Sequence, residues 1–171
     1  MPTPPSLLQQ AEIARRIPHQ GRMCLLDTVT TWDDARIVCQ ASSHRAPDNP
    51  LRAQGRLGAA CGIEFAAQAM AVHGALLAES EADNATTGAA PRVGYLASVR
   101  SVNLYVQRLD DIELDLTVTA ERMLGDANNI LYSFKLEART HLLLQGRAAV
   151  VLDAAMLRQQ PDPSGHSGAS P

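Results

Sequence analysis

One carboxylate stands out in the sequence because its surroundings are apolar. Glu64 lies in the run 57–71, in which Gln68 is the other strongly polar side chain. A glutamate and a glutamine four residues apart share one face of a helix. Burial disfavours the ionised carboxylate, and the neutral acid can donate a proton. We predict that Glu64 is a general acid oriented by Gln68; the alternative is a glutamate at a dimer seam or paired with Arg22 or Arg56.

Two histidines are candidate partners for this acid. Imidazole titrates near neutrality and can remove a proton from the carbon next to a thioester carbonyl. His19 follows Pro18 in a loop before a strand-like run, and His44 opens a polar loop that leads to the apolar helix. For each of them the simpler interpretation is an exposed loop histidine. His73 follows Glu64 by about two and a half helical turns, which favours a core or interface role.

The start of the apolar helix offers groups for binding a substrate. We expect the helix to begin at or near Gly58, so that unpaired amides of its first turn can hold a thioester carbonyl. Gly62 would let a substrate approach closely, although a glycine there also suits simple packing. The predicted substrate-binding residues are therefore Cys61, Gly62 and Gln68. The spacing of histidines, cysteines and carboxylates does not indicate a metal site, and we expect no cofactor.

The rest of the chain divides into one long helix and several strands. Residues 57–78 are rich in strong helix formers and contain no proline, which predicts one central helix. A short helix is expected within 6–16, with irregular loops at 43–55 and 79–90. Apolar runs and alternation predict six strands, at 23–30, 36–42, 93–106, 113–122, 130–138 and 142–152.

These elements predict an α+β domain. A helix that is apolar on every side must be buried, and an antiparallel sheet curved around it is the simplest cover. That arrangement is the hot-dog fold; a helix packed on one face of an open sheet is the alternative. We assign a single domain to residues 6–157, preceded by a flexible N-terminus at 1–5 and followed by a disordered tail at 158–171.

Composition excludes several classes of partner. The formal net charge of -3 provides no basic field for a nucleic acid. Although residues 57–78 are long and apolar, Glu64, Gln68 and His73 within them favour a buried helix over a membrane span. The three cysteines lack a C-x-x-C spacing and are expected to be reduced. With no recognisable signal peptide, we predict a cytoplasmic protein.

Two motifs resemble those of bacterial 3-hydroxyacyl-ACP dehydratases, in which ACP is acyl carrier protein. Residues 17–27 (IPHQGRMCLLD) resemble their opening, where a Pro-His segment precedes an apolar strand that ends in an acidic residue. Residues 62–69 (GIEFAAQA) are similar to their central-helix motif, in which a catalytic glutamate is followed four residues later by glutamine. Residues 94–152 resemble their four-stranded second half. The resemblance covers most of the chain and implies a hot-dog fold.

A closer resemblance is to the divergent hot-dog subfamily found with aryl polyene pigment synthesis. It rests on residues 43–51 (SHRAPDNPL) and 95–100 (YLASVR). The usual dehydratases carry their catalytic histidine in a Gly-His-Phe-Pro motif before the helix, whereas residues 50–53 here read PLRA. Three sources of the base remain open, namely His19, His44 and a histidine from another subunit.

The resemblance implies dehydration of 3-hydroxyacyl thioesters, carried on acyl carrier protein, to trans-2-enoyl thioesters in aryl polyene or fatty-acyl biosynthesis. A histidine would remove the C2 proton and Glu64 would protonate the departing hydroxyl. The implied partners are the acyl carrier protein with its 3-hydroxyacyl chain and a second hot-dog subunit, in a homodimer or in a heteromer with another hot-dog dehydratase. The alternatives are an acyl-thioester hydrolase, in which Glu64 activates water, and a non-catalytic subunit that binds the acyl chain.

Overall fold

The computed structural model describes residues 8–84, 94–126 and 128–152, so the predicted flexible segments 1–5 and 158–171 lie outside the described residues. Its helices are α1 (Gln10–Ala14) and α2 (Gly62–Asn84). Its strands are β1 (Leu8–Gln9), β2 (Thr28–Trp32), β3 (Arg36–Ala41), β4 (Tyr95–Leu104), β5 (Leu116–Gly125), β6 (Asn129–Ala138) and β7 (His141–Val151).

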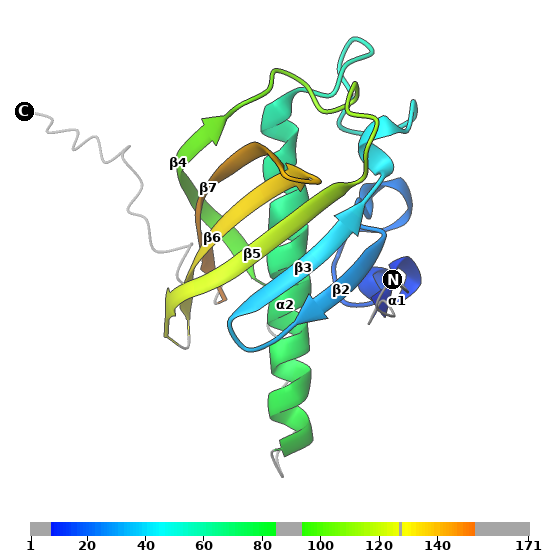
Figure 1. Cartoon of the computed structure of the whole chain (residues 1–171). Helices are drawn as coiled ribbons and strands as arrows, with labels where there is room; N and C mark the ends of the chain where they lie inside the picture. Colours follow the sequence, from blue (N-terminus) through cyan, green and yellow to red (C-terminus); the bar gives the residue numbers. More distant parts are fainter. Residues whose placement is uncertain (1–7, 85–93, 127, 153–171) are drawn as a thin grey trace, which may run out of the picture.

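The strands form one antiparallel sheet that curves around α2. Their order is β1-β2-β3-β5-β6-β7-β4, so β4 is the last strand at one edge. Figure 1 shows α2 running along the inner side of the curved sheet, where it contacts β3, β5 and β6. A seven-stranded antiparallel sheet around one long helix is the hot-dog fold, as the sequence predicted.

Burial follows the periodicities of the two kinds of element. Along β6 every second side chain is buried, from Ile130 to Ala138, because alternate residues of a strand point to the same face. On α2 the buried set includes Phe65, Ala66 and Val72. Within the described residues, Ala59–Asp83 is the one helical segment long and apolar enough to cross a membrane, and half of its most apolar window is buried inside the protein. This is the burial expected of a core helix.

Several predicted boundaries were wrong. The helical segment begins near Gly58, as expected, but its first residues, Ala59–Cys61, form a 3-10 turn, and the α-helix α2 starts at Gly62. It also continues to Asn84 through residues that we expected to form a loop. Alanine, glutamate and serine are compatible with a helix there, and Glu79 pairs with Arg16 at 3.0 Å, which ties this part of α2 to the end of α1.

The first predicted strand was also placed too early. Residues Gly21–Met23 form a 3-10 turn, and β2 begins only at Thr28. The backbone at Met23 and Leu25 bonds to side chains: Gln68 bonds to both residues, and Ser43 donates to the Leu25 carbonyl at 2.7 Å. Because those backbone groups are already satisfied, the apolar run does not need a strand partner. Pairing with β3 starts only at the Asp27 amide, which donates to the Gln40 carbonyl at 2.9 Å.

A buried histidine joins the middle of α2 to the sheet. Nε2 of His73 lies 2.7 Å from the Asp33 carbonyl, in the turn between β2 and β3, and Nδ1 lies 2.9 Å from the hydroxyl of Tyr132 on β6. A carbonyl can only accept, so Nε2 donates and Nδ1 of the neutral ring accepts from Tyr132. Burial lowers the pKa of His73 and raises that of Tyr132 to about 12. Of the two roles expected for His73, core or interface, these contacts support the core role.

Gly62 lets the start of α2 lie directly against the sheet. A Cβ atom placed on Gly62 would lie 2.2 Å from Cδ2 of Leu144 and 3.1 Å from Cδ2 of Leu136. Both leucines are fully buried, so neither can easily move aside. Gly74, in the same helix, has no such neighbour within 4 Å. Alanine substitutions at Gly62 and Gly74 therefore compare a crowded position with an open one in the same helix.

We expect Gly62→Ala to lower the free energy of unfolding by roughly 1–3 kcal/mol, because the added methyl group overpacks the contact with Leu144. Gly74→Ala should raise it by roughly 0.5–1 kcal/mol, because alanine is the better helix former and has open space there. Urea unfolding of both variants measures the two effects. Equal stabilities for the two variants would contradict the close packing at Gly62.

The lowered pKa of His73 predicts sensitivity to acid. Its folded pKa lies below the ordinary value of 6.5, so folding favours the neutral ring. This contribution is complete above about pH 6.5 and is lost as the pH falls toward the folded pKa. Urea midpoints measured between pH 5 and 8 should therefore decrease on the acid side. His73→Gln should flatten that decrease, and His141→Gln, which changes an exposed histidine, is the control. An unchanged slope in His73→Gln would contradict the assignment of the acid sensitivity to His73.

Candidate active site

The structure brings Glu64 and His19 together. Nε2 of His19 lies 3.0 Å from Oε1 of Glu64, and the two side chains are 28% and 32% exposed, so the pair is partly open to solvent. Glu64 is in the first turn of α2. His19 lies in the loop after α1, which is anchored by the buried Ile17 and by a hydrogen bond of 2.7 Å from the Gln20 amide to the Ala14 carbonyl.

Gln68 fixes both the helix and the loop around this pair. Its Nε2 donates to Oε1 of Glu64 at 3.1 Å and to the Met23 carbonyl at 2.7 Å. Its Oε1 accepts from the Leu25 amide at 2.9 Å. These bonds use both amide hydrogens and the oxygen, so the orientation of this fully buried side chain is determined by its partners. Gln68 therefore orients Glu64, and it does so from the protein interior.

The two oxygens of Glu64 are not equivalent. Oε1 faces both His19 and Gln68, whereas Oε2 has no hydrogen-bond partner among the described residues. Because Oε1 accepts the hydrogen bond from Gln68 and lies 3.0 Å from Nε2 of His19, a proton on this carboxyl group belongs on Oε2. Oε2 is therefore the atom that this arrangement presents for proton exchange.

The two nitrogens of the His19 ring have different surroundings. Nδ1 is buried and lacks a hydrogen-bond partner in the described part of the chain. A hydrogen on Nδ1 would have no acceptor there, and a buried unsatisfied donor is costly. Nε2 faces Oε1 of Glu64 at 3.0 Å. Neither nitrogen is then both exposed and free.

His44 is not joined to Glu64. The ring is fully buried, and its Nε2 lies 3.0 Å from the Ile112 carbonyl, to which it donates. Burial lowers the pKa of His44, so the ring is favoured in its neutral form. It lies in the 3-10 turn Ser43–Arg45, and its contacts hold that turn to the segment before β5. The two candidate histidines, equal in the sequence, thus have different surroundings.

The other predicted residues at the start of α2 have contacts within the protein. Gly62 packs against Leu144, where a Cβ atom would not fit, so a glycine is needed there for packing. The Cys61 thiol lies 3.8 Å from the Leu51 carbonyl and remains partly exposed. The amides of Ala59, Cys61 and Gly62 donate to backbone carbonyls, so these three are not free to hold a thioester oxygen.

Sequence reasoning missed a cluster that shapes the loop before α2. Asp110 accepts from the Leu57 amide at 2.9 Å and pairs with Arg52 and Arg108. Arg52 also donates to the carbonyls of Ala46 and Gly55, at 2.8 and 3.0 Å. The hydrogen bond from Arg108 holds the pKa of Asp110 well below its usual range. Only the charges were visible in the sequence, because Arg52 and Asp110 are 58 residues apart.

Arg22 and Arg56, the alternative partners expected for Glu64, are not paired with it. Arg22 lies 3.3 Å from Asp48, beside a hollow of about 400 Å³ between the loop at 21–24 and the loop at 43–49. Neither His19 nor Glu64 lines this hollow. No group of three or more histidine, cysteine, aspartate or glutamate side chains in the described ranges is arranged to hold a metal ion.

Comparison with known proteins agrees with this fold. One similar solved structure is a chain of the dehydratase heterocomplex ApeI:P from Xenorhabdus doucetiae, with a TM-score of 0.71, 22% identity, and coverage of 86% of this chain and 97% of that chain. A putative thioesterase from Silicibacter has a TM-score of 0.56 and 9% identity, covering 89% of this chain and 96% of its own.

A hypothetical thioesterase protein with coenzyme A from Streptococcus pneumoniae has a TM-score of 0.51 and 12% identity, and the match covers 73% of this chain and 84% of that chain. No curated protein sequence matches the chain. The model of one family, described as ApeP-like, ApeP dehydratase, matches residues 11–159. That match includes His19, Glu64 and Gln68 and spans most of the sequence, and so the chain belongs to the ApeP-like dehydratase family.

Proposed function

We propose that this protein dehydrates 3-hydroxyacyl thioesters on acyl carrier protein to trans-2-enoyl thioesters, in aryl polyene or fatty-acyl biosynthesis in the cytoplasm. The observation that carries the proposal is the geometry of Glu64, whose Oε1 faces Gln68 and His19 while Oε2 has no partner among the described residues. A neutral carboxyl group held this way can protonate the C3 hydroxyl as it leaves. The family match supports the reaction class.

The reaction also needs a group that removes the C2 proton. His44 is buried against Ile112, and His19 has one nitrogen against Glu64 and the other buried. We therefore assign the base to a second hot-dog subunit and assign His19 to the orientation of Glu64. The name of the similar ApeI:P structure describes a heterocomplex, which supports a heteromeric arrangement here.

A mass-spectrometric assay with a short 3-hydroxyacyl-ACP tests the proposal. The chain should be assayed alone and with a second hot-dog dehydratase that carries the usual histidine motif. Loss of water only when both subunits are present is the expected result. Loss of water by this chain alone would place the base within it, and release of the free acid would instead identify a thioester hydrolase.

Glu64→Gln should abolish turnover in this assay, with a loss on the order of 100-fold or more, because the amide cannot donate the carboxyl proton. The substitution keeps the size of the side chain and a group that can accept from Gln68. Glu81→Gln, on the exposed surface of the same helix, is the matched control. Undiminished dehydration by a well-folded Glu64→Gln protein would exclude Glu64 as the acid.

Two substitutions of His19 separate orientation from base catalysis. His19→Gln retains an N–H that can reach Oε1 of Glu64, so it should keep activity within about tenfold of the wild type, whereas His19→Ala should lose on the order of 100-fold. His44→Gln, which can still donate to the Ile112 carbonyl, should remain active once folding is verified by circular dichroism. Equal losses in the two His19 variants would identify His19 as the base.

A further inference from the structure

The β4 edge of the sheet is suited to another protein strand. Within the described residues, β4 pairs with β7 on one side and has no strand on the other. Large apolar side chains are exposed on it and just after it, namely Tyr95, Leu96, Leu104 and Tyr105. An unpaired strand with exposed apolar residues is a template for pairing with a second chain. The proposed function requires such a second subunit.

Two arginines lie side by side at this edge. Arg100 on β4 is directly opposite Arg147 on β7, so their side chains share one face of the sheet. Both are exposed, and neither side chain forms an ion pair or hydrogen bond with another described residue. Like charges directly opposite each other destabilise a sheet. A negatively charged group from another molecule would relieve the repulsion between Arg100 and Arg147.

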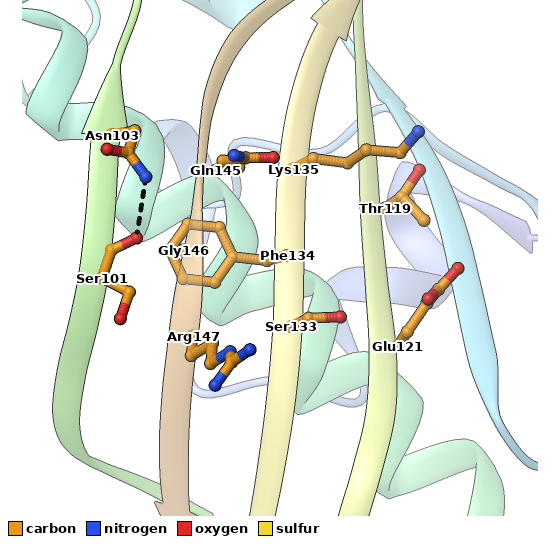
Figure 2. A pocket seen from close by; sticks show the side chains of 10 residues that line it. All are labelled: Ser101, Asn103, Thr119, Glu121, Ser133, Phe134, Lys135, Gln145, Gly146 and Arg147. Carbon is orange, nitrogen blue, oxygen red and sulfur yellow. Dashed lines mark hydrogen bonds between the residues drawn. The ribbon is translucent and has the colours of Figure 1, made fainter.

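Nearby acidic side chains do not neutralise Arg100 and Arg147. Arg147, Lys135 and Glu121 line a hollow of about 540 Å³. Figure 2 shows this hollow on the face of the sheet turned away from α2, with Lys135 and Glu121 extending away from Arg147, toward β5 and β3. Glu121 lies 3.9 Å from Arg36, and Lys135 lies 3.0 Å from Glu137. The described acidic side chains of this face are thus already paired with other bases.

A second copy of this chain is a poor partner for this edge. Two identical antiparallel strands related by a two-fold axis bring the middle of each strand against the middle of the other. Arg100 is at the middle of the ten-residue β4. Self-pairing would therefore collect Arg100 and Arg147 of both copies on one face, and such juxtaposition of like charges disfavours association.

We propose that Arg100 and Arg147 form a charge selector at the β4 edge. It accepts the edge strand of a different hot-dog subunit that presents carboxylates at the facing positions, and it disfavours a second copy of this chain. This inference rests on the proposed heteromeric function and adds the surface that chooses the partner. It concerns association, so it can be tested without measuring turnover.

A variant in which the charges of Arg100 and Arg147 are reversed should associate with the wild-type chain. We expect an equimolar mixture of the full-length wild type with the Arg100→Glu/Arg147→Glu variant to associate at least about tenfold more tightly than either protein alone, by sedimentation equilibrium. Added NaCl should weaken the mixed complex and strengthen wild-type self-association, because screening removes attraction in one and repulsion in the other. Hydrogen exchange should show new protection in Tyr95–Leu104.

The control is Arg36→Glu, an exposed change on β3 away from the edge, which should give no gain when mixed with wild type. Three results would each overturn the charge selector: a wild-type dimer as tight as the mixture, a mixture that does not associate, or new protection outside β4. None of these results bears on the assay of Glu64. Failure of the charge selector and failure of the proposed function are therefore distinguishable.

Discussion

The arrangement of the candidate site depends on the hydrogen bonds of one buried amide, that of Gln68. Its nitrogen binds Glu64 and the Met23 carbonyl, and its oxygen binds the Leu25 amide. Rotating the amide by half a turn would place oxygen against oxygen at Met23 and hydrogen against hydrogen at Leu25. The loop that carries His19 is thereby fixed to the helix that carries Glu64, which keeps the two side chains in contact.

The helical half of the site could be predicted from the sequence, and the loop half only in part. Glu64 and Gln68 are identifiable because a fixed helical spacing places them on a common face. Burial was predicted correctly for Gln68 alone, because the Glu64 side chain is 32% exposed. His19 and His44 lie in irregular loops, where sequence separation does not determine direction. Their distinction arises from tertiary contacts: His44 is drawn to the Ile112 carbonyl, 68 residues away.

The same reasoning explains which elements were predicted well. The central helix, β3 and the four strands that follow the helix have strong periodicity, and the sheet that they form was anticipated. The strand expected at 23–30 was wrong at its beginning because side chains from distant segments satisfy the backbone at Met23 and Leu25. The loop before α2 depends similarly on Asp110 and Arg52, whose meeting requires the complete fold.

The contacts of His73 have a consequence for how the protein accommodates ligands. Gln68 holds α2 to the loop before β2, and His73 holds it to Asp33 and to Tyr132 on β6. Shifting the helix along its axis by even one residue, about 1.5 Å, would stretch these bonds at two separate points. The hydrogen bonds at these two points therefore oppose both sliding and rotation of α2 within the sheet. If the proposed acyl substrates differ in chain length, the adjustment must come from side-chain rotation or from the surrounding loops.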